Sequence, residues 1–374
     1  MLNDYAGIIS LYENEDDIKS LTKNRPLGSI PFCGRYRIID FILSNMVNSG
    51  INNVAILTKS NSRSLIDHVG SGKPWDLDRK LGGLFVFNFG FESSNFNDIE
   101  MLKNNIEYLY RTKEKNVILS SSYMICNINF EEAVKCHEKS GKDVTIIYKK
   151  INDEKKNFIN CDVLNIDKNN NILSVGKNIG TEGILNISME MYIMKKSVLL
   201  SILNKAIKTG YYKNLKEAIN KNISNLSSNA YEFNGYLSCI NSTNSYYKAN
   251  MDMLNLDINK ELFFNNGLIY TKIMDEAPTK YHKDSHVTNS LIANGCLIEG
   301  SVENSIISRR VTVHKNVSIK NSIILQNCEI KENAKLTNII VDKNVTIEEN
   351  KELKGDEEIP LVIEKKPLYM VKER

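Results

Sequence analysis

Branched apolar residues recur at intervals of six after about residue 285, with Asn, Gly, Ser and Lys between them. A six-residue period is typical of a parallel β-helix, in which three short strands form a coil and each coil buries its apolar residues on one axis. The period therefore predicts a left-handed parallel β-helix of hexapeptide repeats over residues 285–374, with an irregular β-sandwich as the alternative. The repeat has four registers: Leu291 and Leu297; Val311, Val317 and Ile323; Ile324, Ile330 and Leu336; Val341 and Ile347.

The first 256 residues alternate strand and helix patterns. This alternation favours an α/β domain with a mostly parallel, Rossmann-like sheet. Residues 257–284, which include Pro278, are predicted to link it to the β-helix. Strands are expected at residues 5–11, 53–58, 116–119, 143–149, 158–175 (with a turn at 167–171) and 187–194, and helices at 37–49, 61–69, 130–139 and 244–256.

The composition excludes several classes of partner. The chain has 48 basic and 45 acidic residues, a formal net charge of +3, which argues against nucleic-acid and membrane partners. No run of eighteen apolar residues occurs, and the N-terminus lacks the basic start of a signal peptide. The seven cysteines are dispersed without a C-x-x-C pair, which argues against zinc and favours a reducing cytoplasm.

The segment that follows the first predicted strand is unsuited to a triphosphate. Residues 10–23 (SLYENEDDIKSLTK) contain no glycine. Phosphate loops bring backbone N–H groups close to the ligand and keep carboxylates away. The segment instead carries four acidic residues, Glu13, Glu15, Asp16 and Asp17. The sequence thus predicts a nucleotide-binding type of domain that has lost its phosphate loop.

Three segments resemble the glucose-1-phosphate adenylyltransferase family, the ADP-glucose pyrophosphorylases of bacterial glycogen synthesis. They are residues 32–51 (FCGRYRIIDFILSNMVNSGI), 70–83 (GSGKPWDLDRKLGG) and 235–254 (GYLSCINSTNSYYKANMDML). The resemblance implies a nucleotidyltransferase-like domain followed by a β-helix. It also implies, for active members, adenylyl transfer from ATP to glucose 1-phosphate with Mg²⁺ held by carboxylates.

The chain differs from the family pattern at the positions that bind the metal ion and the nucleotide. The two metal-binding aspartate positions fall on Ser122, in LSSSY, and on Cys239, in LSCINS. The nucleotide-site lysine position falls on Leu27, in RPLGSIPF, and residues 95–108 have no counterpart of the family's nucleotide-reading loop. Because a hydroxyl and a thiol are poor ligands for a hard dication, no Mg²⁺ cofactor is expected.

Three basic residues are candidates for binding anions. Lys177, in LSVGKN, matches a lysine that contacts the sugar phosphate in the family, although a solvated surface charge is the alternative interpretation. Glu190, in SMEMY, replaces a glycine beside the sugar site. Arg35 and Arg37 are candidates for an effector site or for an interface.

The resemblance as a whole is to the D-type, non-catalytic subunit of the family. It implies a regulatory subunit of glycogen synthesis that pairs with the catalytic chain, as a tetramer, and responds to a sugar-phosphate effector. Two alternatives remain open: an active sugar-phosphate nucleotidyltransferase with relocated ligands, and a hexapeptide acyltransferase that uses His282, His286 or His314 as a general base.

Overall fold

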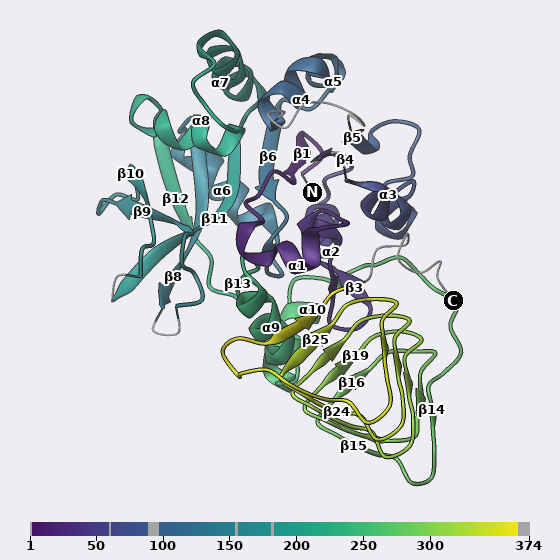
Figure 1. Ribbon diagram of the computed structural model, residues 1–374. Helices are drawn as coiled ribbons and strands as arrows, with labels where there is room; N and C mark the ends of the chain where they lie inside the picture. Colours follow the sequence, from purple (N-terminus) through teal and green to yellow (C-terminus); the bar gives the residue numbers. More distant parts are fainter. Residues whose placement is uncertain (1, 60, 89–96, 154–155, 181–182, 366–374) are drawn as a thin grey trace.

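The protein consists of an α/β part and a β-helix, which lie side by side in the computed structural model (Figure 1). The structure describes residues 2–59, 61–88, 97–153, 156–180 and 183–365. Residues 95–96 of the region compared with the nucleotide-reading loop, and residues 366–374 of the predicted β-helix range, lie outside the described residues.

The α/β part is built on one sheet, which has nine strands in the described residues. Strands β6, β1, β4 and β5 are parallel neighbours, and β12 is parallel to β8. Strand β11 runs antiparallel to both β6 and β8 and joins these two parallel groups. The strands are β1 (Tyr5–Ser10), β4 (Asn53–Thr58), β5 (Gly83–Asn88), β6 (Asn116–Ser121), β8 (Val144–Asn152), β9 (Asp162–Ile166), β10 (Ile172–Lys177), β11 (Ile184–Lys195) and β12 (Ser228–Glu232).

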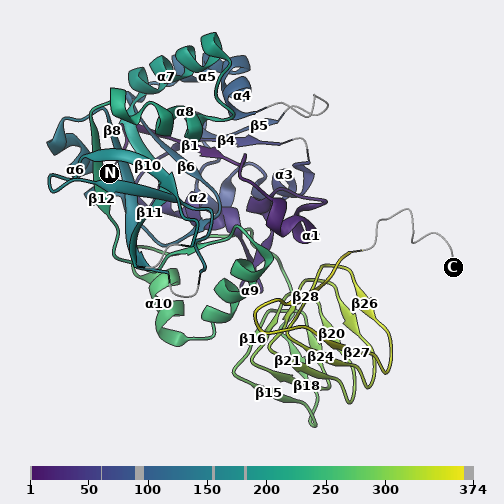
Figure 2. The ribbon, with the colours of Figure 1, turned by 60° about the vertical axis from the view of Figure 1, so that its left-hand side comes forward.

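Helices cover both faces of this sheet, because its strands are apolar on both sides. In β1, Tyr5 and Ile9 enter one core, while Ala6 and Ile8 enter the other. Helices α2 (Ile38–Asn48), α3 (Arg63–Val69), α6 (Phe130–Ser140), α9 (Thr243–Asp252) and α10 (Leu256–Phe264) contribute to the first core. Helices α4 (Asp98–Asn104), α5 (Ile106–Arg111), α7 (Lys196–Thr209) and α8 (Leu215–Lys221) contribute to the second and lie together in Figure 2.

The predicted helices and strands of this part are confirmed, with two adjustments. The helix expected at 244–256 ends at Asp252, and α10, which begins at Leu256, extends into the range 257–284 predicted as a linker. The reason is Asn255, whose side chain accepts hydrogen bonds from the backbone N–H groups of Asp257 and Ile258 and so starts a new helix. The strand expected from 158 begins at Asp162, and β9 and β10 form an antiparallel hairpin about the predicted turn.

Short elements connect these layers. Helix α1 (Lys19–Thr22) follows the four acidic residues between 13 and 17. Strand β2 (Pro31–Phe32) pairs with β3 (Tyr36–Arg37), and β7 (Met124–Ile125) pairs with β13 (Ser238–Cys239).

The C-terminal part is the expected parallel β-helix, with three five-stranded parallel sheets in the described residues. The inward-facing residues Val302, Ile307, Val313 and Ile319 are fully buried, at steps of five, six and six residues. One coil therefore takes 17 residues, as the pairing of Ser301 with Ser318 shows. The strands are β14 (Lys280–Tyr281), β15 (His286–Thr288), β16 (Leu291–Ile292), β17 (Leu297–Ile298), β18 (Ser301–Glu303), β19 (Ile306–Ile307), β20 (Thr312–Val313), β21 (Ser318–Lys320), β22 (Ile323–Ile324), β23 (Glu329–Ile330), β24 (Lys335–Thr337), β25 (Ile339–Val341), β26 (Thr346–Ile347), β27 (Glu352–Lys354) and β28 (Leu361–Ile363).

Asparagine makes the corners of the β-helix. Asn304, Asn321 and Asn338 have φ values of 51°, 46° and 54°, in the left-handed region that asparagine tolerates better than most residues. The Asn304 side chain donates to Asn321 and the Asn321 side chain to Asn338, each with an Nδ2 to Oδ1 distance of 3.2 Å, and Asn338 donates to the Gly355 carbonyl at 3.1 Å. The abundant asparagines of this part therefore have a structural role in the turns.

The two parts contact each other through apolar and ionic groups. Ile323, Leu325 and Ile340 of the β-helix belong to the first core of the α/β part. Beside them, the Arg25 guanidinium and the Asp342 carboxylate form an ion pair of 2.5 Å with both side chains nearly inaccessible to solvent.

Candidate functional site

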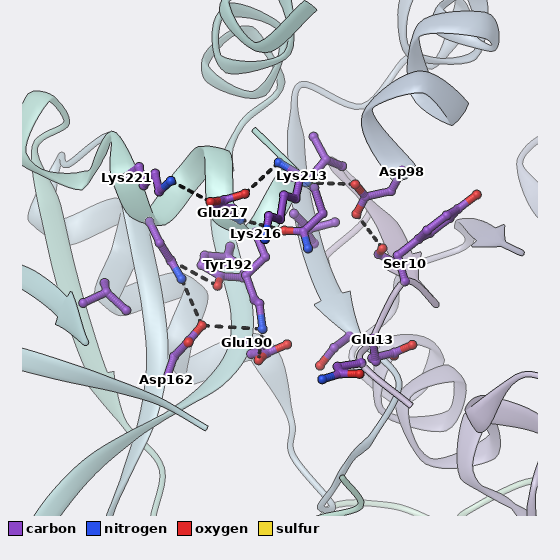
Figure 3. Close-up of a pocket in the computed structure, with 18 of the residues that line it drawn as sticks. Ser10, Glu13, Asp98, Asp162, Glu190, Tyr192, Lys213, Lys216, Glu217 and Lys221 are labelled. Atoms are coloured by element: carbon purple, nitrogen blue, oxygen red, sulfur yellow. Dashed lines mark hydrogen bonds and ion pairs between the residues drawn. The ribbon is translucent and has the colours of Figure 1, made fainter. Parts of the chain in front are cut away.

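A cavity of about 600 Å³ opens where β1 and β6 end, between these strands and the β9–β11 region (Figure 3). The ends of parallel strands are the usual place for a ligand in an open α/β sheet. Ser10, Glu13 and Asp98 line one wall, and the opposite wall has more charge. That opposite wall includes Asp162, Lys177, Glu190, Lys213, Lys216, Glu217 and Lys221.

Glu13 lines the cavity in the segment that follows β1. Its Oε1 accepts hydrogen bonds from the Ser122 backbone N–H at 2.7 Å and from the Ser122 hydroxyl at 2.8 Å. Its Oε2 is buried and has no hydrogen-bond partner among the described residues. Burial raises the pKa of the Glu13 carboxyl to about 7, against the lowering effect of the Ser122 hydrogen bonds and of Lys59.

The neighbouring Glu15 is also held by the fold. Glu15 accepts a hydrogen bond from the Leu27 backbone N–H at 3.1 Å and pairs with Lys59 at 3.4 Å. The Leu27 side chain is completely buried in the first core. The acidic segment therefore forms a packed connection with its own hydrogen bonds, which accounts for the missing glycines.

Ser122 and Cys239 occupy separate places beneath the cavity. In the described part of the chain, neither residue lines the cavity itself, and both are buried. Ser122 contacts Glu13, as above, whereas the Cys239 Sγ lies 3.3 Å from the Cys161 Sγ. Ser122 and Cys239 therefore have different partners, Glu13 and Cys161.

This donor set does not fit a Mg²⁺ ion. A hydroxyl and a thiol offer no carboxylate, and the nearby acids are engaged elsewhere, Glu13 with Ser122 and Glu190 with Lys216. In the residues that the structure describes, no group of three His, Cys, Asp or Glu side chains is arranged to hold a metal.

Lys177 and Glu190 both line the cavity, but both are ion-paired. The Lys177 Nζ lies 2.6 Å from Asp162 and donates to the Asn160 carbonyl. Glu190 accepts from Lys216 at 2.6 Å and from the Tyr123 hydroxyl. As Figure 3 shows, Lys216 lies between Asp162 and Glu190, with 3.6 Å to Asp162.

The sequence reasoning missed Lys216 and Asp162. Burial lowers the pKa of the Lys216 ammonium, but Glu190 and Asp162 outweigh that effect, and the pKa lies above its usual value. Lys216 is on a seven-residue helix and Asp162 begins a strand, so no local pattern marks either. The sequence offered one signal: Glu190 stands among apolar residues in SMEMY, and a buried carboxylate needs a cation beside it.

Arg35 and Arg37 lie at a second, smaller cavity of about 120 Å³ between the two parts of the protein. Three further cations line it, Lys272, Arg309 and Arg310. Arg37 donates to the Ser64 carbonyl and hydroxyl at 2.7 and 2.8 Å, and burial lowers its pKa to about 10. The structure thus brings the two predicted arginines together with cations from the β-helix.

The three histidines of the β-helix take part in polar contacts at its surface. His314 lies between two carboxylates, 3.0 Å from Glu329 and 3.8 Å from Glu299. His282 lies 3.3 Å from Asp284, and the His286 ring contacts the Asp284 carbonyl.

Comparison with protein-family models defines the class. Residues 18–255 match the nucleotidyl transferase model, and residues 273–359 match the GlmU-like C-terminal hexapeptide model. The chain is therefore a nucleotidyl transferase-family protein with a hexapeptide β-helix, as the sequence predicts.

The curated relatives narrow this class, because the chain is similar to them over most of its length. It belongs to the family of the glycogen biosynthesis proteins GlgD and the glucose-1-phosphate adenylyltransferases. It is 37% identical to the GlgD protein of Bacillus subtilis strain 168 over 84% of this chain and 82% of the relative. Identity is 36% to GlgD of Geobacillus stearothermophilus (84% and 82%) and 30% to a glucose-1-phosphate adenylyltransferase of Mycoplasma mobile (80% and 80%).

Among the described residues, no helix has the length and apolar character needed to cross a bilayer.

Proposed function

We propose that this chain is a non-catalytic, regulatory subunit of glycogen synthesis that pairs in the cytoplasm with a catalytic glucose-1-phosphate adenylyltransferase chain. The observation that carries the proposal is the pair formed by Glu13 and Ser122. A carboxyl group that lines the cavity would repel a triphosphate, and Ser122 offers no carboxylate to a metal ion that could offset this repulsion. The names of its relatives support the link to glycogen.

The charges around the cavity support the proposal that this chain does not catalyse adenylyl transfer. Adenylyl transfer needs cations around the triphosphate, since charge stabilisation provides most of the rate enhancement in phosphoryl transfer. Here Glu13 and Asp98 lie on the wall next to β1, and opposite them Lys177, Lys216 and Lys221 are each paired with an acid. A triphosphate at this site would meet carboxylates without a metal ion to offset them.

The first experiment compares three samples: this chain, the catalytic chain from the same source, and both together. We expect this chain alone to form no ADP-glucose above a protein-free blank. We expect it to co-purify with the catalytic chain as a mixed tetramer and to change the rate of ADP-glucose formation. Turnover by this chain alone, or failure of the two chains to co-purify, contradicts the proposal.

An active enzyme with relocated ligands is the competing hypothesis, and two acids of the cavity bear on it. Asp162 and Glu190 lie on one wall, but Lys216 and Lys177 neutralise them. A lysine that bridges two carboxylates takes the place of a metal ion and does not recruit one. The same pairing argues against Lys177 as a free sugar-phosphate ligand.

The regulatory part of the proposal assigns an anionic effector to the small cavity between the two parts. Arg35, Arg37, Lys272, Arg309 and Arg310 surround about 120 Å³, the size of a phosphate group with part of a sugar. Because arginine binds phosphate oxygens through two parallel hydrogen bonds, this set suits a phosphorylated metabolite.

Calorimetric titration with glucose 6-phosphate and with inorganic phosphate tests this site. We expect Arg309→Gln to weaken binding at least tenfold. Arg111→Gln is the matched control, since Arg111 is highly exposed and pairs with Glu107, and neither residue lines this cavity. Equal binding by the Arg309 variant and the wild type places the effector elsewhere.

A further inference from the structure

Two cysteines far apart in the sequence are in contact beneath the cavity. The Sγ atoms of Cys161 and Cys239 are 3.3 Å apart, although 78 residues separate the two positions. Both side chains are buried, with 1% of each residue exposed, and both are reduced in the structure. A disulfide bond requires about 2.05 Å between sulfurs, so a closure of about 1 Å is enough to join them.

The surrounding backbone fixes this contact. The Asn178 N–H donates to the Cys161 carbonyl at 2.9 Å, which holds Cys161 at the base of the β9–β10 hairpin. Cys239 pairs with Met124 in the β7–β13 ladder. Between the two, the Asn241 amide donates to the Ile159 carbonyl at 2.7 Å. The thiols therefore face each other because two separate elements are held in register.

The other cysteines do not share this environment. Cys126 contacts the Asn45 amide and Cys136 contacts the Asn229 amide. Cys296 and Cys328 donate to backbone carbonyls of the β-helix, at 3.1 and 3.0 Å. The Cys161–Cys239 contact is thus specific within a chain that uses its thiols mainly as small packing groups.

We propose that Cys161 and Cys239 are a modification site that closes to an intramolecular disulfide when the chain meets a low-molecular-weight disulfide as oxidant. One cysteine loses its thiol proton to solvent and attacks the reagent disulfide, releasing one thiol. The second cysteine then loses its proton and displaces the second reagent thiol from the mixed disulfide. Overall, two protein thiols are oxidised to one disulfide and one reagent disulfide is reduced to two thiols.

The bond would fix one wall of the cavity. Cys161 directly precedes Asp162, and the hairpin that it anchors carries Lys177. A disulfide bond from Cys161 to Cys239 in β13 would connect the Lys177–Asp162 ion pair to the segment that leads into α9. Reaction is slow in the closed structure, because burial first and then Cys161 and Glu190 raise the pKa of the Cys239 thiol. It is therefore expected to follow opening of the hairpin.

The test incubates the full-length chain with oxidised glutathione at pH 8 and, in parallel, with reduced glutathione. Remaining thiols are alkylated after denaturation, and peptides are mapped by mass spectrometry. We expect a cross-linked peptide pair that contains Cys161 and Cys239, a mass about 2 Da lower for the unalkylated chain, and alkylation of the other five cysteines. A higher urea midpoint should accompany oxidation.

Cys161→Ser and Cys239→Ser should each lose the cross-link and the gain in urea midpoint, and Cys136→Ser, at a half-buried thiol, should keep both. The wild-type peptide map decides the matter even where a serine variant folds poorly. Full alkylation of both thiols after oxidation overturns the proposal. Glutathione left on either thiol without a cross-link, or a cross-link between other cysteines, also overturns it.

Discussion

Glu13→Gln tests whether the carboxyl beside Ser122 opposes folding at neutral pH. The pKa of Glu13 is about 7 in the folded chain, and its ordinary value is 4.5. Below pH 4.5 the group is neutral in both states. Between pH 4.5 and 7 the folded chain retains a proton that the unfolded chain has lost, so stability falls as the pH rises. At 1.36 kcal/mol per pKa unit, the loss reaches about 3 kcal/mol above pH 7.

Glutamine keeps the oxygen that accepts from Ser122 and replaces the unpartnered Oε2 with an uncharged amide. The variant should gain up to about 3 kcal/mol at pH 8, less about 1 kcal/mol for a weaker hydrogen bond from Ser122. At pH 4 it should gain nothing. Urea unfolding at both pH values, followed by the fluorescence of the single, fully buried Trp75, measures this difference.

Glu15→Gln is the matched control for Glu13→Gln, because it removes a charge from the same segment while leaving Glu13 in place. It should leave the pH dependence of wild-type stability intact. If Glu13→Gln and the wild type lose the same free energy of unfolding between pH 4 and pH 8, Glu13 is ionised at no cost and the reasoning fails.

Three further predictions concern the ion pair between the two parts, the asparagine corners and the missing metal ligands. Arg25→Met should lower the free energy of unfolding by about 3–5 kcal/mol by leaving Asp342 buried without its partner, and adding Asp342→Leu should recover most of it in urea titrations. Asn321→Ala should cost about 1–3 kcal/mol and Asn321→Gly clearly less, because glycine accepts the positive φ of 46°; a larger loss for glycine contradicts this. Ser122→Asp with Cys239→Asp should still form no ADP-glucose, since Glu13 remains; a nucleotide-dependent rate would show that the metal ligands were the sole obstacle.

The sequence predicts the β-helix well because its pattern is local. Most inward positions repeat after five or six residues, so a short window reveals the coil. The six-residue period did not reveal that one step in this coil, from Val302 to Ile307, takes five residues. The five-residue step coincides with corners such as Asn304 and Asn321, where a left-handed residue turns the chain sharply. The direction of β11 was likewise not predictable, because strand periodicity reports burial and not orientation.

For the site, the sequence shows which residues stand at the expected positions but not which residues they contact. The lack of glycine between Ser10 and Lys23 is visible in the letters, and so are Ser122 and Cys239. That Glu13 would contact Ser122, 109 residues away, depends on how the chain folds. The contact of Lys216 with Glu190 is also long-range, and no motif marks Lys216 as the partner of the acid in SMEMY.

Ser122 and Cys239, which we expect at the family's metal positions, each depend on a neighbour in the fold. Ser122 provides two hydrogen bonds to Glu13, a residue that needs them because it is buried. Cys239 is small and apolar enough to pack on Cys161. An aspartate at 122 would set two carboxylates against each other, and one at 239 would bring a charge into a buried contact. Return to a metal site therefore requires changes at Glu13 and Cys161 as well, and each single step would destabilise the fold. Selection for folding alone would then keep these positions from reverting, even without selection on chemistry.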